Sequence, residues 1–142
     1  MFEKIKKIYG NRSFPPRLFW FLFVIFIINA AGIVFHWYMK FFWFDMVTHT
    51  LGGLWTGSAV VWFLGFVDDK EKAVSAKEIF FISLAVVACI GLLWEIYEVA
   101  VDTLIKLFAY DAIDGLSDLF FDLLGASFAA GYALWLRATR LA

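Results

Sequence analysis

The sequence predicts an all-α, polytopic membrane protein, a bundle of four transmembrane helices with both termini in the cytoplasm. Three observations lead to this fold class: 63% of the 142 residues are hydrophobic and 18% charged, four long apolar runs divide the chain, and Lys and Arg gather on one side of them. Soluble globular domains do not have this composition. We expect one membrane domain over residues 18–142.

The basic segment of residues 1–17 contains Pro15-Pro16, which stops any helix before the first apolar run. About 20 apolar residues are needed to cross roughly 30 Å of hydrocarbon. Four runs are long enough, so we expect helices over about 18–37, 41–67, 79–107 and 113–136. A cleavable signal peptide is the alternative for the first run, but the apolar residues continue past Asn29-Ala30-Ala31, so we expect the segment to be retained.

Positive charge is distributed unevenly between the two sides of the predicted bundle. The side with both termini has ten Lys and Arg residues: Lys4, Lys6, Lys7, Arg12, Arg17, Lys70, Lys72, Lys77, Arg137 and Arg140. The other side has only Lys40 and Lys106. Because positively charged loops stay in the cytoplasm, we expect a multi-pass protein of the cell (inner, cytoplasmic) membrane with cytoplasmic termini.

Acidic residues gather at the opposite, outer side. Eight of the thirteen fall in or beside the predicted spans, and with the orientation above all eight lie in the outer half of the bundle: Asp45, Glu95, Glu98, Asp102, Asp111, Asp114, Asp118 and Asp122. On each helix they share one face at helical spacing, and His49 follows Asp45 by one turn. We therefore expect the three acidic faces to meet in a common pocket.

Small residues continue each acidic face toward the centre of the membrane. Gly52 and Gly53 follow His49, Gly91 precedes Glu95, and Gly125 and Ala126 follow Asp122. Small side chains let helices approach closely in lipid. The pattern therefore predicts a close helix crossing beneath the acidic residues.

Several carboxylates placed side by side in a poorly solvated site need compensation, because each desolvated charge costs several kcal/mol. Bound divalent cations, protonation of several acids, or a water-filled vestibule would each provide it. Oxygen ligands with one imidazole suit a hard or borderline ion such as Mg²⁺, Mn²⁺, Ca²⁺, Fe²⁺ or Zn²⁺. We expect a divalent metal ion, and the number of acids leaves room for two.

The predicted metal ligands are His49, Glu95, Asp118, Asp122 and Asp114, with Glu98 and Asp45 as the catalytic carboxylates. Structural roles remain open for some of these residues. Asp45 and His49 could form an ion pair within one helix, and Asp111 and Asp114 could cap the amino end of the last helix.

Three motifs resemble those of the VanZ-like and YjdF-like group of small membrane proteins. They are Phe44-Asp45-x3-His49-x3-Gly53, Trp94-Glu95-x2-Glu98 and Asp114-x3-Asp118-x3-Asp122-x2-Gly125-Ala126. The similarity covers residues 44–131, and Asp122 stands where that group usually has Asn. The resemblance implies a small integral membrane protein and links it loosely to glycopeptide resistance at the cell envelope.

The leading functional hypothesis is a metal-dependent hydrolase that acts at the outer leaflet on a lipid or lipid-linked substrate. A cation or proton translocator is the first alternative, because intramembrane acids can bind and relay ions. A non-catalytic scaffold or subunit is the second. We expect membrane lipid as a partner and no nucleic acid, while homo-oligomerisation stays open.

Overall fold

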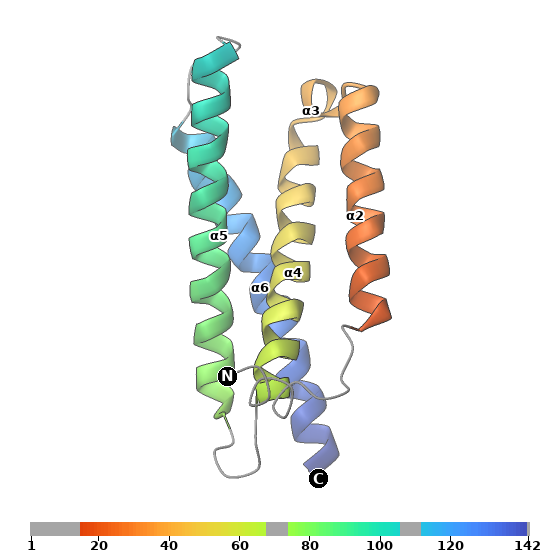
Figure 1. Ribbon diagram of the computed structural model, residues 1–142, viewed down its shortest axis with the longest axis vertical. Coiled ribbons are helices and arrows are strands. Elements are labelled where there is room, and N and C mark those ends of the chain that lie inside the picture. Colours follow the sequence, from red (N-terminus) through yellow and green to blue (C-terminus); the bar gives the residue numbers. More distant parts are fainter. Residues whose placement is uncertain (1–14, 68–73, 106–111, 142) are drawn as a thin grey trace, which may run out of the picture.

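The computed structural model describes residues 15–67, 74–105 and 112–141, and every element in these ranges is a helix (Figure 1). The helices are α2 (Pro16–Val34), α3 (Trp37–Lys40), α4 (Phe42–Val67), α5 (Ala76–Ile105) and α6 (Ala112–Leu141). The predicted all-α class is confirmed for this part of the chain. Some residues of the prediction lie outside it: Lys4, Lys6, Lys7, Arg12, Lys70, Lys72, Lys106 and Asp111.

Three of the helices are long and apolar enough to cross a membrane. They are α2, the stretch Ala76–Val101 of α5 and the stretch Ile113–Leu136 of α6. With 26 residues α4 is also long enough, but it is not among these three, and it carries Asp45 and His49 together with several Thr and Gly residues. The chain is therefore a membrane protein with multiple candidate spans.

The first apolar run forms two helices. Pro16 occupies the first turn of α2, where the missing N–H of proline costs no hydrogen bond. The helix ends at Val34 and not near Trp37, because His36 adopts a left-handed conformation with φ 57° and ψ 38° that a right-handed helix cannot include. The turn directs α3 back across the end of the bundle, where the Tyr38 hydroxyl donates a hydrogen bond to the Asn29 side chain.

Helices α4 and α6 form the closest pair, α5 packs against both, and α2 packs on α4. In Figure 1, α5 and α2 stand on opposite sides of α4, and α6 crosses behind α5 and α4. The beginning of α2 and the end of α6 lie at one end of the bundle. The other end carries α3, the start of α4 and the end of α5, and we refer to it as the α3 end.

Glycines allow the close contact between α4 and α6. A Cβ atom on Gly53 would overlap the backbone carbonyl oxygen of Asp122, and one on Gly125 would overlap the carbonyl oxygen of Thr50. One turn below, a Cβ on Gly57 would come within 2.9 Å of the Ala126 Cα. The predicted crossing of small residues is therefore present, and it holds the backbones of α4 and α6 together directly beneath the acidic residues.

Apolar side chains cover the outside of the bundle. Along α2, residues such as Phe19, Phe23 and Phe26 are exposed, and Ile25 and Gly32 are the buried ones among its described residues. Among the described residues, the most deeply buried positions are mostly small, including Ser83, Ala126 and Ala130, and Val87 is the largest of them. An apolar exterior around a core of small residues is the arrangement expected of helices that pack in lipid.

Candidate metal centre

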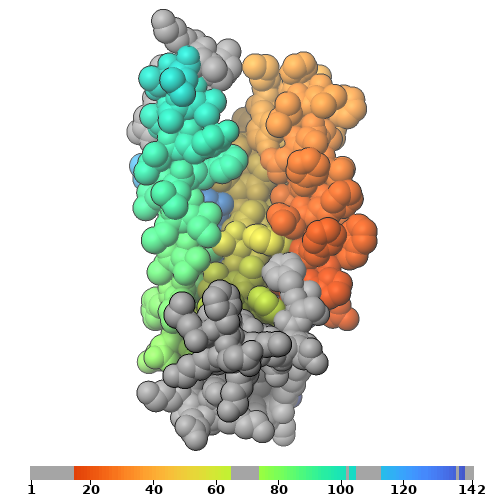
Figure 2. All heavy atoms as spheres, in the orientation of Figure 1, coloured from red at the N-terminus to blue at the C-terminus, as the bar shows by residue number. Residues whose placement is uncertain are grey.

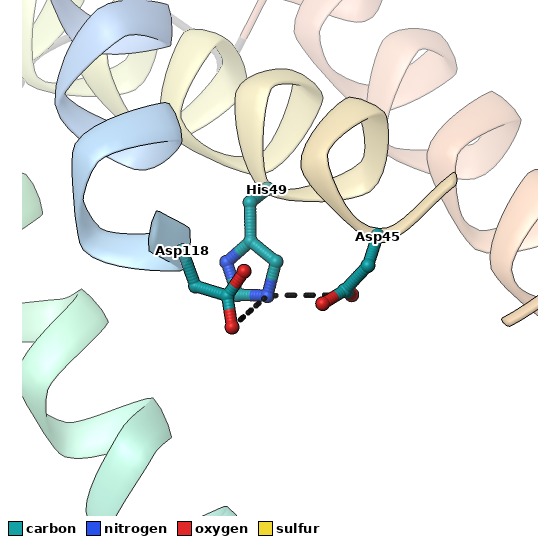
Figure 3. Close-up of side chains that lie close together, drawn as sticks. All are labelled: Asp45, His49 and Asp118. Carbon is teal, nitrogen blue, oxygen red and sulfur yellow. Dashed lines mark ion pairs between the residues drawn. The ribbon is translucent and has the colours of Figure 1, made fainter. Parts of the chain in front are cut away.

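A histidine and three carboxylates meet where α4 and α6 cross. On α4, Asp45 and His49 are one turn apart, and on α6 the same spacing separates Asp118 from Asp122. Each pair therefore lies on one face of its helix. Figure 3 shows the side chains of Asp45 and His49 leaving α4 on the side away from α2, with Asp118 reaching the imidazole from α6.

The two ring nitrogens of His49 have different neighbours. Nε2 lies 3.6 Å from Asp45 Oδ1 and 3.8 Å from Asp118 Oδ2 (Figure 3), whereas Nδ1 lies 3.4 Å from Asp122 Oδ1. A proton on Nδ1 would point at the Asp122 carboxylate. The lone pair of Nε2 would then face the space between Asp45 and Asp118. In metal sites, a carboxylate commonly accepts a hydrogen bond from one ring nitrogen of a histidine and so orients the other nitrogen toward the ion.

These four side chains differ in exposure. The side chains of His49, Asp118 and Asp122 are 10%, 5% and 12% exposed, and that of Asp45 is 32% exposed. Burial increases in the direction from Asp45 to Asp118. The group is therefore most accessible to solvent at Asp45 and least accessible at Asp118 on α6.

Asp118 also belongs to a second group, with Glu95 and Glu98 of α5. In each of the two groups, Asp45–His49–Asp118 and Glu95–Glu98–Asp118, one ligand atom per residue lies within 4.8 Å of the others. Glu95 and Glu98 are half-buried, whereas Asp118 is buried. Helices α4, α5 and α6 thus each bring an acidic face to the same place, as the sequence predicts, and Asp118 connects the two groups.

Gly91 makes room for Asp122 on the α5 side. A Cβ at Gly91 would lie 2.8 Å from Asp122 Oδ2 and 3.1 Å from Leu119 Cδ1. On the α4 side, a Cβ at Gly52 would meet Asp122 Oδ1 at 4.0 Å. The Asp122 carboxylate therefore fits beside α5 because α5 presents a glycine to it, whereas a Cβ at Gly52 would be at an ordinary contact distance.

Comparison with known families gives one match. Residues 4–139 match the family described as "Predicted membrane protein (DUF2238)". The chain belongs to this family. Neither the curated proteins nor the solved structures contain a significant match. Membership agrees with the candidate membrane spans of the structure.

One of the predicted ligands, Asp114, lies outside the two groups. Asp114 is exposed in the first turn of α6 and belongs to neither group. Its position fits the alternative of a carboxylate at a helix amino end, where negative charge is favourable. Asp102 lies on α5, but its side chain is outside the described part of the structure, as is all of Asp111.

Tyr38 is a neighbour of the site that the spacing of acidic residues does not reveal. It lies in α3, its ring packs edge-on against Phe44 at 4.8 Å between centroids, and its hydroxyl binds Asn29 of α2. Burial raises the pKa of this hydroxyl, and the nearby Asp45 and Glu98 carboxylates add to the effect. Tyr38 thus joins α2 to the open side of the site, a role that follows from the turn at His36.

Proposed function

We propose that this membrane protein binds a divalent metal ion between α4 and α6 and uses it to hydrolyse a lipid or lipid-linked substrate. The observation that carries the proposal is the Asp45–His49–Asp118 group, whose ligand atoms lie within 4.8 Å of one another at a buried carboxylate. His49, Asp45 and Asp118 would hold the ion, and Asp122 would orient the imidazole. Such carboxylate-bound histidines are common in metal sites.

The donor set narrows the choice of ion. Carboxylate oxygens with one imidazole nitrogen suit Mn²⁺, Fe²⁺ or Zn²⁺, and also Mg²⁺ or Ca²⁺ when waters complete the shell. The ion would offset part of the negative charge that the three helices bring together. A second ion at Glu95, Glu98 and Asp118 is the two-ion alternative, with Asp118 as the bridging ligand.

The orientation that we propose places the site in the outer half of the inner membrane. With α4 counted as a span, the chain crosses the membrane four times, and both termini lie on the same side. The excess of Lys and Arg on that side supports a cytoplasmic location for both termini. The α3 end would then face outward. The resemblance to the VanZ-like and YjdF-like group supports a role at the cell envelope, and the substrate would be reached from the outer leaflet.

The proposed chemistry is hydrolysis. The ion would polarise the scissile bond and make a water molecule more acidic. Glu98, half-buried beside Asp118, would accept the proton of the attacking water and return it to the leaving oxygen or nitrogen as the bond breaks. One water is consumed, and the ester, amide or phosphoester is divided into an acid and an alcohol or amine.

Tight packing beneath the site disfavours the translocator alternative. The backbone of Gly53 contacts that of Asp122, and Gly57 lies against Ala126 immediately below. Ala126 and Ala130 are fully buried. An ion bound at His49 would have to pass this crossing to reach the other end of the bundle, so the packing supports a site that is open at one end.

A cleavage assay tests the proposed function. Full-length protein in vesicles of mixed ester phospholipids is expected to release lipid products, detected by mass spectrometry, and to stop when a chelator is added. Activity should return with Mn²⁺ or Zn²⁺ and should be lost in Glu98→Gln. Glu78→Gln is the matched control, because Glu78 is an exposed acid at the far end of α5 that binds the backbone N–H of Ser75 at 2.8 Å. Cleavage that persists in chelator would contradict a metal-dependent mechanism.

A change at Gly91 is expected to weaken metal binding without removing a ligand. In Gly91→Ala the new Cβ would displace the Asp122 carboxylate and free the His49 ring, and loss of such an orienting contact costs roughly 10- to 100-fold in affinity. Titration of the purified protein with Zn²⁺ or Mn²⁺ measures the change. Gly131→Ala is the control, because a Cβ at Gly131 meets nothing within 4 Å. Equal affinities for both variants would refute the orienting role of Asp122.

A further inference from the structure

A groove runs along the face of the bundle between α5 and α2. Figure 2 shows α4, with a small part of α6, recessed between these two helices. Helix α2 packs on α4, which leaves α5 and α2 as the two walls of the groove. Both of these helices expose apolar side chains, among them Phe23 and Phe26 on α2 and Leu92 and Ile96 on α5. Because the helices lie in lipid, an open groove of this kind admits acyl chains from the side.

The carboxylates on the helices that form this groove differ in burial. The buried carboxylates Asp118 and Asp122 lie on α6, whereas Glu95 and Glu98 on the α5 wall are half-buried. One divalent ion at His49, Asp45 and Asp118 would leave the charges of Glu95 and Glu98 without a metal. These two residues, which we refer to as the α5 carboxylates, therefore form an acidic edge next to the proposed ion.

Among the described residues, no Lys or Arg forms an ion pair with this edge. Lys40, at the α3 end, donates from Nζ to the carbonyl oxygen of Phe35 at 2.9 Å. Arg17 and Lys77 lie in the first turns of α2 and α5, at the opposite end of the bundle. Among the side chains that the structure describes, an anionic lipid would thus meet carboxylates at this edge, with the proposed metal ion to neutralise it.

From the groove and this charge arrangement we infer that the substrate is a bilayer phospholipid with a primary amine in its head group, of the phosphatidylethanolamine class. Its ammonium group would lie against Glu95, its phosphate would face the ion, its acyl chains would follow the groove, and Glu98 would keep its proposed role as the base. The inference rests on the proposed function, because the phosphate needs the ion. It assigns Glu95 to an organic cation, keeps Glu98 as the proposed base, and leaves room for one metal ion per chain.

Charge complementarity predicts which lipids are preferred. An ammonium group donates three hydrogen bonds to carboxylates, whereas a quaternary ammonium donates none and an acetylated amine has no charge. Phosphatidylethanolamine should therefore bind better than N-acetyl phosphatidylethanolamine or phosphatidylglycerol of the same acyl chains, by roughly tenfold for one desolvated ion pair. Phosphatidylcholine should bind with an affinity between that of phosphatidylethanolamine and those of the other two lipids.

Native mass spectrometry of the full-length protein in micelles that contain equal amounts of these four lipids tests the inference. The wild-type protein and the control Glu78→Gln are expected to retain phosphatidylethanolamine. Glu95→Gln, which keeps the shape of the side chain, should bind all four lipids alike. Elemental analysis of the same samples reports the metal content.

The outcomes separate the two proposals. A wild-type protein with one bound ion and no lipid preference would overturn the amine assignment and leave the metal site standing. Two ions per chain, or a preference that survives Glu95→Gln, would also overturn it. A protein without bound metal would instead refute the proposed function, and the amine assignment with it.

Discussion

Replacement of Asp118 by Asn is expected to lower the affinity for divalent metal ions more than any other conservative change in the chain. Asp118 belongs to both ligand groups, and its side chain is 5% exposed. The amide has the same shape but no charge, so a loss of more than about 100-fold is expected, beyond what the loss of an outer contact costs. Isothermal titration with Mn²⁺ or Zn²⁺ in detergent measures it.

Two controls accompany Asp118→Asn. Asp114→Asn changes an exposed acid one turn earlier on α6 that belongs to neither group, so its affinity is expected to stay within about threefold of the wild type. Thermal unfolding without metal shows whether Asp118→Asn still folds. If Asp118→Asn and Asp114→Asn bind metal equally well, Asp118 is not the shared ligand.

Gly125→Ala is expected to cause the largest loss of stability. Its Cβ would overlap the carbonyl oxygen of Thr50, which belongs to the backbone of α4 and cannot move aside as a side chain would. Forcing extra volume into such a contact costs about 1–3 kcal/mol, and more where both backbones are rigid. The melting temperature in detergent should fall, and metal affinity should fall with it, because Asp122 lies one turn before Gly125.

Gly131→Ala provides the comparison within the same helix. Nothing lies within 4 Å of a Cβ at Gly131, so this substitution should leave the melting temperature unchanged or raise it slightly through the better helix propensity of Ala. Equal losses at both positions would mean that the α4–α6 contact is not the origin of the effect.

Much of the fold follows from apolar runs and prolines, because both act locally. The start of α4 and the start of α6 differ by one residue from the predicted positions 41 and 113. The end of α2 was not predictable in this way. His36 is not a glycine, so its left-handed conformation is not expected from its residue type, and no run of apolar residues indicates the nearby hydrogen bond from Tyr38 to Asn29.

The meeting of the acidic faces was predictable because helical spacing and chain direction together fix the depth and face of each residue. The separate roles of the individual side chains within the site were not predictable. Spacing alone ranks Asp122 with Asp118 as a ligand, whereas the structure puts Asp122 on the other nitrogen of His49. Likewise Asp114 continues the acidic stripe of α6 in the sequence, yet it lies exposed at the helix start. Such distinctions depend on side-chain direction, which spacing does not encode.

Elemental analysis of the purified full-length protein tests the central claim most directly. After purification without chelator, the wild-type protein is expected to contain close to one divalent ion per chain. In Asp118→Asn the metal should be absent, and in Asp114→Asn it should be retained. A wild-type protein that contains no divalent ion, and whose melting temperature does not change when Mn²⁺, Zn²⁺ or chelator is added, would contradict the metal site.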